Sequence, residues 1–237
     1  VPESASTEEI LPIHAEMAEP IVSEEKSASE AGVETSEKKV ALTFDAAWGA
    51  DKTEEIMKIV KEYNFNATFF LVGFWVDKYP ELVKQIDEQG FEIGTHSNTH
   101  PDMTKLGKEA MKLELETCCN MITNITNKQV ELFRPPYGAY NNNLIETAKD
   151  LNLITIQWSV DSLDWKGISG EAITQRVLNG VKNGSIILCH NNSDHILDAL
   201  PMIFDRLKMQ GYKVISVGEL IYKSNYTIDR QGVQKPN

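Results

Sequence analysis

The 237-residue sequence lacks a long hydrophobic run and has only three cysteines. No stretch approaches the ~18 consecutive apolar residues that a membrane-spanning helix requires. Two cysteines, Cys118 and Cys119, are neighbours on a predicted helix, where a mutual disulfide is geometrically unfavourable. Positive charge is also scarce, because 23 Lys and Arg residues face 35 Asp and Glu residues. The sequence therefore predicts no membrane span, no disulfide framework and no nucleic-acid partner.

Glycine-rich phosphate loops and a nucleophile–base pair are missing as well. No such loop follows any predicted strand, so a dinucleotide-binding fold has little support. Cys189 is adjacent to His190, but neighbouring strand residues point to opposite faces, so the two should not share a pocket. We expect Cys189 to be a buried apolar residue.

Most of the acidic excess lies in the first 37 residues. This segment contains ten glutamates, one lysine and no aromatic residue. It cannot bury enough apolar surface to offset its chain entropy, so we expect residues 1–37 to be a disordered leader or tether. The chain starts with Val1 and not with Met. Removal of an upstream export signal would explain this start, and so would a chain that was shortened for another reason. Residues 38–224 should form one nearly neutral domain, followed by a C-terminal tail, 225–237.

Short apolar runs alternate with amphipathic helical stretches from residue 38 onward. Seven runs, mostly rich in β-branched and aromatic residues, are predicted strands: 39–45, 66–72, 91–95, 130–133, 153–160, 185–190 and 212–217. Helices are expected near 52–63, 80–89, 105–122, 141–151, 170–182 and 196–210. Seven β-then-α units favour an α/β fold, with a parallel sheet that is closed into a TIM-like barrel and surrounded by helices. Functional residues of such barrels gather where strands end.

Polar residues of catalytic type stand where five of the predicted strands end. One such residue is usually a cap or a turn former, but five occupied strand ends together favour one site. These residues are Asp45, His96, His100, Arg134, Asp161, Asp164 and His190. The two imidazoles of His96-x3-His100 suit zinc, cobalt or nickel, although two surface histidines would give the same spacing.

These residues belong to five ordered motifs that resemble those of the polysaccharide deacetylases, the NodB-homology carbohydrate esterases. The motifs are Thr43-Phe44-Asp45, His96-Ser97-x-x-His100-Pro101, Arg134-Pro-Pro-Tyr137, Asp161-Ser-Leu-Asp164-Trp165 and Leu188-Cys189-His190. The similarity covers roughly residues 38–222, and the first motif has the FDxxWG form of a Gram-positive branch. It implies a distorted (β/α)7 barrel that removes N-acetyl groups from amino sugars of an extracytoplasmic polysaccharide. Peptidoglycan, at GlcNAc or MurNAc, is the expected substrate.

The resemblance also implies a role for each motif residue. Asp45 is the expected catalytic base and His190 the catalytic acid. Arg134 is expected to orient Asp45, and Asp164 to hold His190. His96 and His100 are the expected ligands of a divalent metal, zinc or else cobalt or nickel. A further group is expected to contact the substrate, as the oxyanion-binding amide or as walls of the acetyl pocket: Tyr137, Trp165 and Leu188.

One position departs from the family pattern. The family usually has two consecutive aspartates in its first motif, the second of which binds metal, but this chain has Ala46 there. We therefore expect His96 and His100 to hold metal more weakly, unless another residue supplies a third ligand. The candidates for that role are Asp45, Asn98, Asp102 and Asp194.

Two other functions stay open at this point. The first is a catalytically weakened glycan-binding protein of the same fold, which the loss of a metal-binding carboxylate at Ala46 would produce. The second is hydrolysis of glycosidic bonds by a carboxylate pair, for which Asp161 and Asp164 are the candidates. In each case we expect a secreted or cell-wall-tethered monomer.

Overall fold

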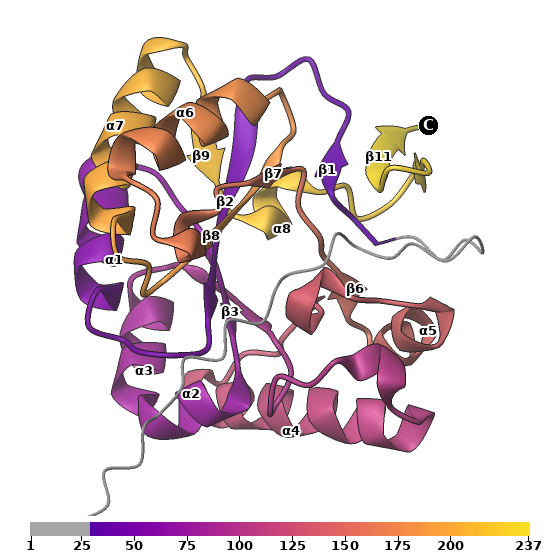
Figure 1. Ribbon diagram of the computed structural model, residues 1–237. Helices are drawn as coiled ribbons and strands as arrows, with labels where there is room; N and C mark the ends of the chain where they lie inside the picture. Colours follow the sequence, from indigo (N-terminus) through magenta and orange to yellow (C-terminus); the bar gives the residue numbers. More distant parts are fainter. Residues whose placement is uncertain (1–28) are drawn as a thin grey trace, which may run out of the picture.

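The computed structural model describes residues 29–237, which form one parallel sheet covered by helices, with a small second sheet at its edge (Figure 1). The main sheet has the strand order β6-β5-β4-β3-β2-β8-β7, and β9 pairs with the first residues of β2. Its strands are β2 Lys39–Ala46, β3 Thr68–Leu71, β4 Glu92–Thr95, β5 Leu132–Phe133, β6 Ile154–Thr155, β7 Val160–Asp161, β8 Ile186–His190 and β9 Lys213–Ile215. All of their pairings are parallel, as the sequence predicts.

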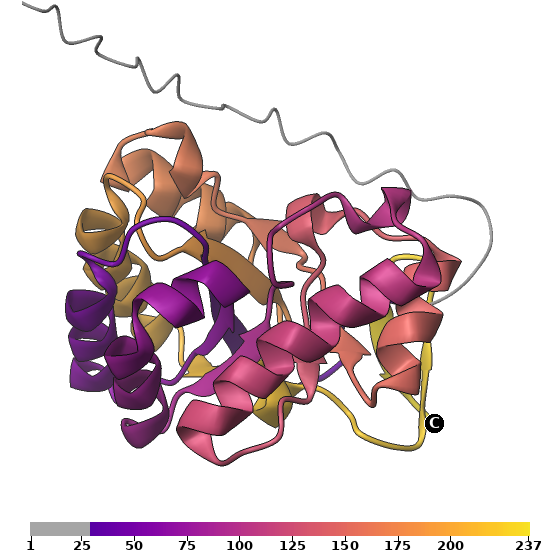
Figure 2. The same ribbon diagram turned by 90° about the horizontal axis from the view of Figure 1, so that it is seen from below.

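The described part of the chain has eight α-helices, of which seven lie on the outside of this sheet and the short last one packs against its inner layer (Figure 2). They are α1 Thr53–Glu62, α2 Gly73–Lys78, α3 Pro80–Glu88, α4 Lys108–Thr126, α5 Asn142–Asp150, α6 Gly170–Gly180, α7 Ile196–Met209 and α8 Val217–Leu220. The sequence predicts six of them and misses the short α2 and α8. Within residues 29–237, no helix is both long and apolar enough to cross a membrane.

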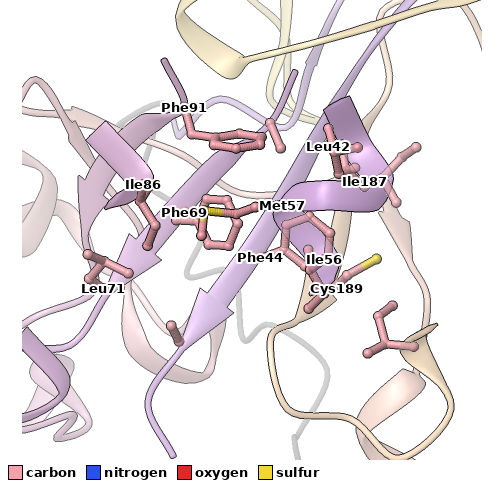
Figure 3. Close-up of a cluster of buried hydrophobic side chains, with 14 of the residues drawn as sticks. Leu42, Phe44, Ile56, Met57, Phe69, Leu71, Ile86, Phe91, Ile187 and Cys189 are labelled. Carbon is pink, nitrogen blue, oxygen red and sulfur yellow. The ribbon is translucent and has the colours of Figure 1, made fainter. Parts of the chain in front are cut away.

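Side chains of β2 alternate between two apolar layers. Leu42 and Phe44 belong to the outer layer, where they meet Ile56 and Met57 of α1 (Figure 3). Ala41 belongs to the inner layer, on the other face of the sheet. Because side chains alternate along a strand, Thr43 and Asp45 point to the same side as Ala41. The packing of β2 thus directs its polar residues toward the inside of the barrel.

The predicted strand 153–160 is interrupted in the structure. Its first residues form β6 and its last residue opens β7, and these two strands are the opposite edges of the sheet. Residues 156–159 cross from one edge to the other, which leaves the barrel open at this point. Ile156 is nonetheless buried in the inner layer, so the apolar pattern continues across the break and resembles one strand.

Residues 29–34, which we call the strap, lie across this opening. The N–H of Glu30 donates to the carbonyl of Thr155 at 2.9 Å, and the carbonyl of Glu30 accepts the N–H of Gln157 at 2.8 Å. Farther along the strap, Gly32 forms a bridge with Ser185. The strap therefore supplies backbone partners to chain segments at the open edges of the barrel.

This arrangement corrects the predicted boundaries of the domain. Residues 29–33 were expected in a disordered leader, but all five are buried against the barrel. The expected tail, 225–237, is also part of the folded unit. It contains the antiparallel strands β10 Tyr226–Ile228 and β11 Val233–Pro236, and β11 pairs with β1 Gly32–Val33 of the strap (Figure 1). Residues 1–28 of the predicted leader lie outside the described residues.

Candidate active site

Asp45 lies at the carboxyl end of β2, in register with His190 of β8. Its Oδ1 is 2.8 Å from Nη1 of Arg134, and its Oδ2 is 3.5 Å from Nε2 of His96. Burial acts to raise the pKa of Asp45, but the charge of Arg134, together with the hydrogen bond that Arg134 donates, acts in the opposite direction and prevails. The pKa therefore lies below its usual value. Asp45 is thus an ionised carboxylate that is hydrogen-bonded to Arg134.

The guanidinium of Arg134 is held from several sides. It is fully buried and follows β5 directly. Nη1 also donates to the hydroxyl of Thr43 at 2.7 Å, and Nη2 donates to the carbonyl of Gln157 at 3.0 Å. The ring of Phe70 lies 4.3 Å from the guanidinium carbon, a cation–π contact. Arg134 therefore has a fixed geometry, and Asp45 takes its orientation from it.

His96 and His100 follow β4 and bring their rings within 4.9 Å of each other. Nδ1 of His96 is 2.7 Å from the carbonyl of Arg134, so this nitrogen carries the proton and Nε2 keeps its lone pair. Nδ1 of His100 is buried and has no hydrogen-bond partner among the described residues. Burial lowers the pKa of both histidines, that of His100 to about 3. Both are neutral imidazoles near pH 7.

This donor set fits a divalent metal such as zinc. Zinc binds neutral imidazole, and a histidine ligand usually donates its other N–H to a carbonyl, as His96 does to Arg134. A third protein ligand is not assembled, because residues 29–237 contain no group of three His, Cys, Asp or Glu side chains placed to hold a metal. The carboxylate of Asp102 instead accepts a hydrogen bond from the Thr104 hydroxyl at 2.6 Å. Ala46 is buried in the outer apolar layer.

His190 is held by Asp164 at two points. Nδ1 of His190 is 2.8 Å from one carboxylate oxygen of Asp164, and the backbone N–H of His190 donates to the other at 2.8 Å. Burial acts to lower the pKa of His190, but the charge and the hydrogen bond of Asp164 outweigh it and raise this pKa. The ring is thus fixed in one orientation and keeps its proton to a higher pH than an ordinary histidine.

The predicted substrate-contacting residues also lie close to this group. Tyr137 stands in the turn Pro136–Gly138 with a φ of +61°, a conformation that is unfavourable outside glycine, and its ring is 4.7 Å from that of His100. Leu188 lies two residues before His190 on β8, so both side chains point to the same face of the strand. Trp165 follows Asp164 directly, and its Nε1 is buried without a partner among the described residues.

The competing nucleophile and carboxylate-pair hypotheses find no support in the contacts. Cys189 is fully buried in the outer layer (Figure 3), and burial raises its pKa well above the usual value. This confirms the prediction for Cys189. Oδ1 of Asp161 accepts the N–H of Leu163 at 2.9 Å, which makes Asp161 a turn former. Since Asp164 uses both oxygens on His190, the two carboxylates are not a free catalytic pair.

Residues 32–156 match the family model described as Polysaccharide deacetylase. The chain belongs to this family. The peptidoglycan-N-acetylglucosamine deacetylase of Bacillus cereus is 34% identical over 189 residues, which cover 78% of this chain and 69% of that protein. The peptidoglycan-N-acetylmuramic acid deacetylase PdaC of Bacillus subtilis is 35% identical over 189 residues, 79% of this chain but only 40% of PdaC.

Solved structures of the same family have a closely similar fold. BA3943 from Bacillus anthracis, described as a CE4 family pseudoenzyme, superposes with a TM-score of 0.79 at 35% identity, covering 82% of this chain and 69% of that one. A mutant of it, described as having restored enzymatic activity, gives 0.79 at 36% identity, covering 82% and 72%. The comparisons confirm the predicted family, the distorted (β/α)7 barrel and the polysaccharide N-deacetylase class.

Three residues that support the deacetylase site were not assigned roles from the sequence. Thr43 and Gln157 both hold Arg134, and the side chain of Gln157 also donates to the carbonyl of Gly138 at 3.1 Å, in the turn of Tyr137. The N–H of Asn191 donates to the carbonyl of Asp45 at 3.2 Å. Thr43 could have been found from its position two residues before Asp45 on the same strand face. Gln157 could have been found as a polar residue within an apolar run.

Proposed function

We propose that this protein is a metal-dependent N-deacetylase that acts on amino sugars of peptidoglycan, at GlcNAc or MurNAc. The observation that carries the proposal is the pairing of Asp45 and His190 across β2 and β8, each with its own buried partner. Amide hydrolysis needs a base for the attacking water and an acid for the departing amine, and these two groups stand side by side. The polymer is proposed from the names of the relatives.

Each residue has one task in this reaction. Ionised Asp45 removes a proton from the attacking water, while Arg134 keeps the carboxylate oriented. The backbone amide of Tyr137 donates to the oxyanion that forms as the water oxygen adds to the acetyl carbon. His190, positioned by Asp164, then protonates the sugar nitrogen as the C–N bond breaks. The products are acetate and a free amino sugar, and no covalent intermediate with the protein is needed.

His96 and His100 would hold the metal in this reaction, with zinc as the first candidate and cobalt or nickel as alternatives. A bound divalent ion would polarise the acetyl carbonyl and acidify the attacking water. The position of the family's third ligand is Ala46, so we infer a lower metal affinity than a site with a carboxylate there would have.

A glycan-binding protein with weakened catalysis is the second candidate. Ala46 favours it, and so does the similarity to BA3943, which is described as a pseudoenzyme. Against it stand the buried ion pair of Asp45 with Arg134 and the buried support of His190. Burying such charged groups costs free energy that a binding surface has no need to spend. We therefore favour the enzyme.

The proposed substrate also sets the place of action. Peptidoglycan lies outside the cytoplasm, so we propose a secreted or cell-wall-tethered protein that acts as a monomer on an N-acetylated glycan. The near-neutral charge balance of the chain beyond residue 37 fits a glycan better than nucleic acid.

An acetate-release assay on peptidoglycan and on chitin oligomers tests the proposal, with and without added zinc, cobalt or nickel. We expect release that depends on metal and falls by at least about 100-fold in Asp45→Asn, because the base is lost. Asp198→Asn, an exposed carboxylate on α7, is the matched control and should release acetate normally. Glycan binding without acetate release under every metal condition would favour the second candidate. An Asp45→Asn variant with most of the normal activity would refute the role of Asp45.

A further inference from the structure

Two exposed aromatic rings lie beside the candidate active site. The side chain of Trp48 is 60% exposed and that of Phe74 is 38% exposed. Their ring centroids are 6.1 Å apart, and the Trp48 ring is 5.1 Å from that of His100. Exposed aromatic surface that adjoins a site is a common mark of ligand binding. The mechanism proposed above gives neither ring a role.

The loop of Trp48 is fixed although its side chain faces solvent. The carbonyl of Gly49 accepts the indole N–H of buried Trp75 at 2.8 Å and the side-chain amide of Asn191 at 3.1 Å. Gly49 itself has a φ of +69°, which a glycine adopts without steric cost. The backbone directly after Trp48 is therefore held by two hydrogen bonds, and little of its conformational entropy would be lost when a ligand binds to the indole.

Phe74 is tied to the loop that carries the two histidines. The N–H of Gly73 donates to the carbonyl of Ser97 at 2.9 Å, and the N–H of Phe74 donates to that of Asn98 at 3.2 Å. A Cβ on Gly73 would lie 2.0 Å from the side-chain oxygen of Asn98, so this close approach requires glycine. The start of α2 and the histidine loop thus form one unit, and Phe74 keeps its place relative to His100.

We propose that Trp48 and Phe74 form a platform for the pyranose ring next to the sugar that loses its acetyl group. The faces of a pyranose carry C–H groups and its hydroxyls point outward around the rim. An exposed aromatic face therefore binds such a ring by removing its apolar face from water. The T-shaped contact between the rings of Trp48 and His100 places this sugar one residue along the glycan from the reacting acetamide. The inference rests on the proposed function, because it takes the ligand to be an N-acetylated glycan.

Calorimetric titration of the full chain with the tetramer and the monomer of N-acetylglucosamine tests the platform. All variants are made in the Asp45→Asn protein, so that the tetramer keeps its acetyl groups during the measurement. We expect Trp48→Ala to weaken tetramer binding roughly tenfold or more and Phe74→Ala to weaken it less, while Trp48→Phe retains most of the affinity. Monomer binding should not change, because one sugar occupies the acetyl pocket alone. Leu113→Ala is the matched control, since Leu113 is also an exposed apolar residue but lies on α4.

Three results would overturn the platform. Trp48→Ala could bind the tetramer as well as its parent does, or it could lose monomer and tetramer affinity equally, which would mean that Trp48 acts through His100. The parent could also fail to bind the tetramer. The platform is tested by binding and the proposed function by acetate release. The platform can therefore be confirmed even if no acetate is released, and the failure of one proposal is distinguishable from the failure of the other.

Discussion

The backbone of Glu30 is hydrogen-bonded to that of Gln157, whose own carbonyl accepts Nη2 of Arg134. The first bond is 2.8 Å long and the second 3.0 Å. Arg134 in turn holds Asp45. The strap, which precedes every strand of the main sheet, is therefore connected to the proposed catalytic base through a single intervening residue and its guanidinium partner.

Two N-terminal truncations distinguish the contribution of the strap to stability from that of residues 1–28. Removing residues 1–34 deletes the backbone partners of Thr155 and Gln157 and uncovers the inner layer beside Val33. We expect a loss of roughly 2–4 kcal/mol in the free energy of unfolding, together with lower acetate release. Removing only residues 1–28 keeps all described strap contacts and is the matched control. Urea denaturation of both proteins measures the difference, and equal midpoints would show that the strap does not stabilise the barrel.

The carboxyl of Glu30 makes the stability of the strap sensitive to pH. Burial raises the pKa of Glu30 to about 7, although hydrogen bonds from Tyr226 and Gln234 act in the opposite direction. The folded state therefore favours the protonated acid. Its stabilising contribution is complete below pH 4.5, the ordinary value, and is lost as the pH rises through about 7. The change amounts to something on the order of 3 kcal/mol.

Glu30→Gln should remove this dependence, because a neutral amide resembles the protonated acid. We expect the variant to be more stable than its parent at pH 8 and about equal to it at pH 5, as measured by urea denaturation across this range. Glu34→Gln changes an exposed glutamate of the same strap and should leave the pH dependence as it is. A parent protein with the same stability at pH 5 and pH 8 would contradict the assignment.

Asp164 should set the alkaline limit of activity. Its charge and its hydrogen bond raise the pKa of His190 against the effect of burial, so His190 stays protonated to a higher pH than an ordinary histidine. In Asp164→Asn the pKa of His190 should fall, and the alkaline limb of acetate release should move to lower pH by about one unit or more. The pH profile of kcat measures this shift. A lower rate with an unmoved alkaline limb would assign Asp164 a structural role only.

Ala46→Asp tests the missing metal ligand. Ala46 is the last residue of β2, in register with Leu71, whose partner Thr95 immediately precedes His96. We expect a carboxylate here to tighten zinc binding about tenfold or more, because an anionic oxygen joins two neutral nitrogens. Without zinc the variant should melt below its parent, since the carboxylate then lies against the outer apolar layer. Zinc should raise its melting temperature more than that of the parent.

Zinc titration by calorimetry after chelator treatment measures the affinities, and Ala46→Asn is the neutral control of similar size. A parent that already binds one zinc tightly, with no gain in Ala46→Asp, would mean that another group fills the third position. A variant that is destabilised with or without zinc would show that the new carboxylate does not reach the histidines.

The site was more predictable from the sequence than the edges of the fold. Parallel strands bring their carboxyl ends together, so Asp45 and His190 could be placed near each other once their strands were predicted. The strap could not be found in this way. Ala31 and Val33 contribute little to a 37-residue segment that contains ten glutamates, so its average composition conceals the five-residue stretch that is buried. The break between β6 and β7 was missed because Ile154 and Ile156 continue one alternating pattern across it.

The pairing of β1 with β11 has a consequence for how the protein is made. Gly32 and Val33 are synthesised long before their partners Val233 and Gln234. The strap therefore cannot pair with β11 until almost the whole described chain has left the ribosome. Contacts between such distant positions form late in folding. A chain that terminates early, anywhere before β11, would carry every residue of the proposed acid–base machinery on a barrel whose opening is not yet secured. The last strand of the described chain thus completes the support of a site that is encoded far upstream.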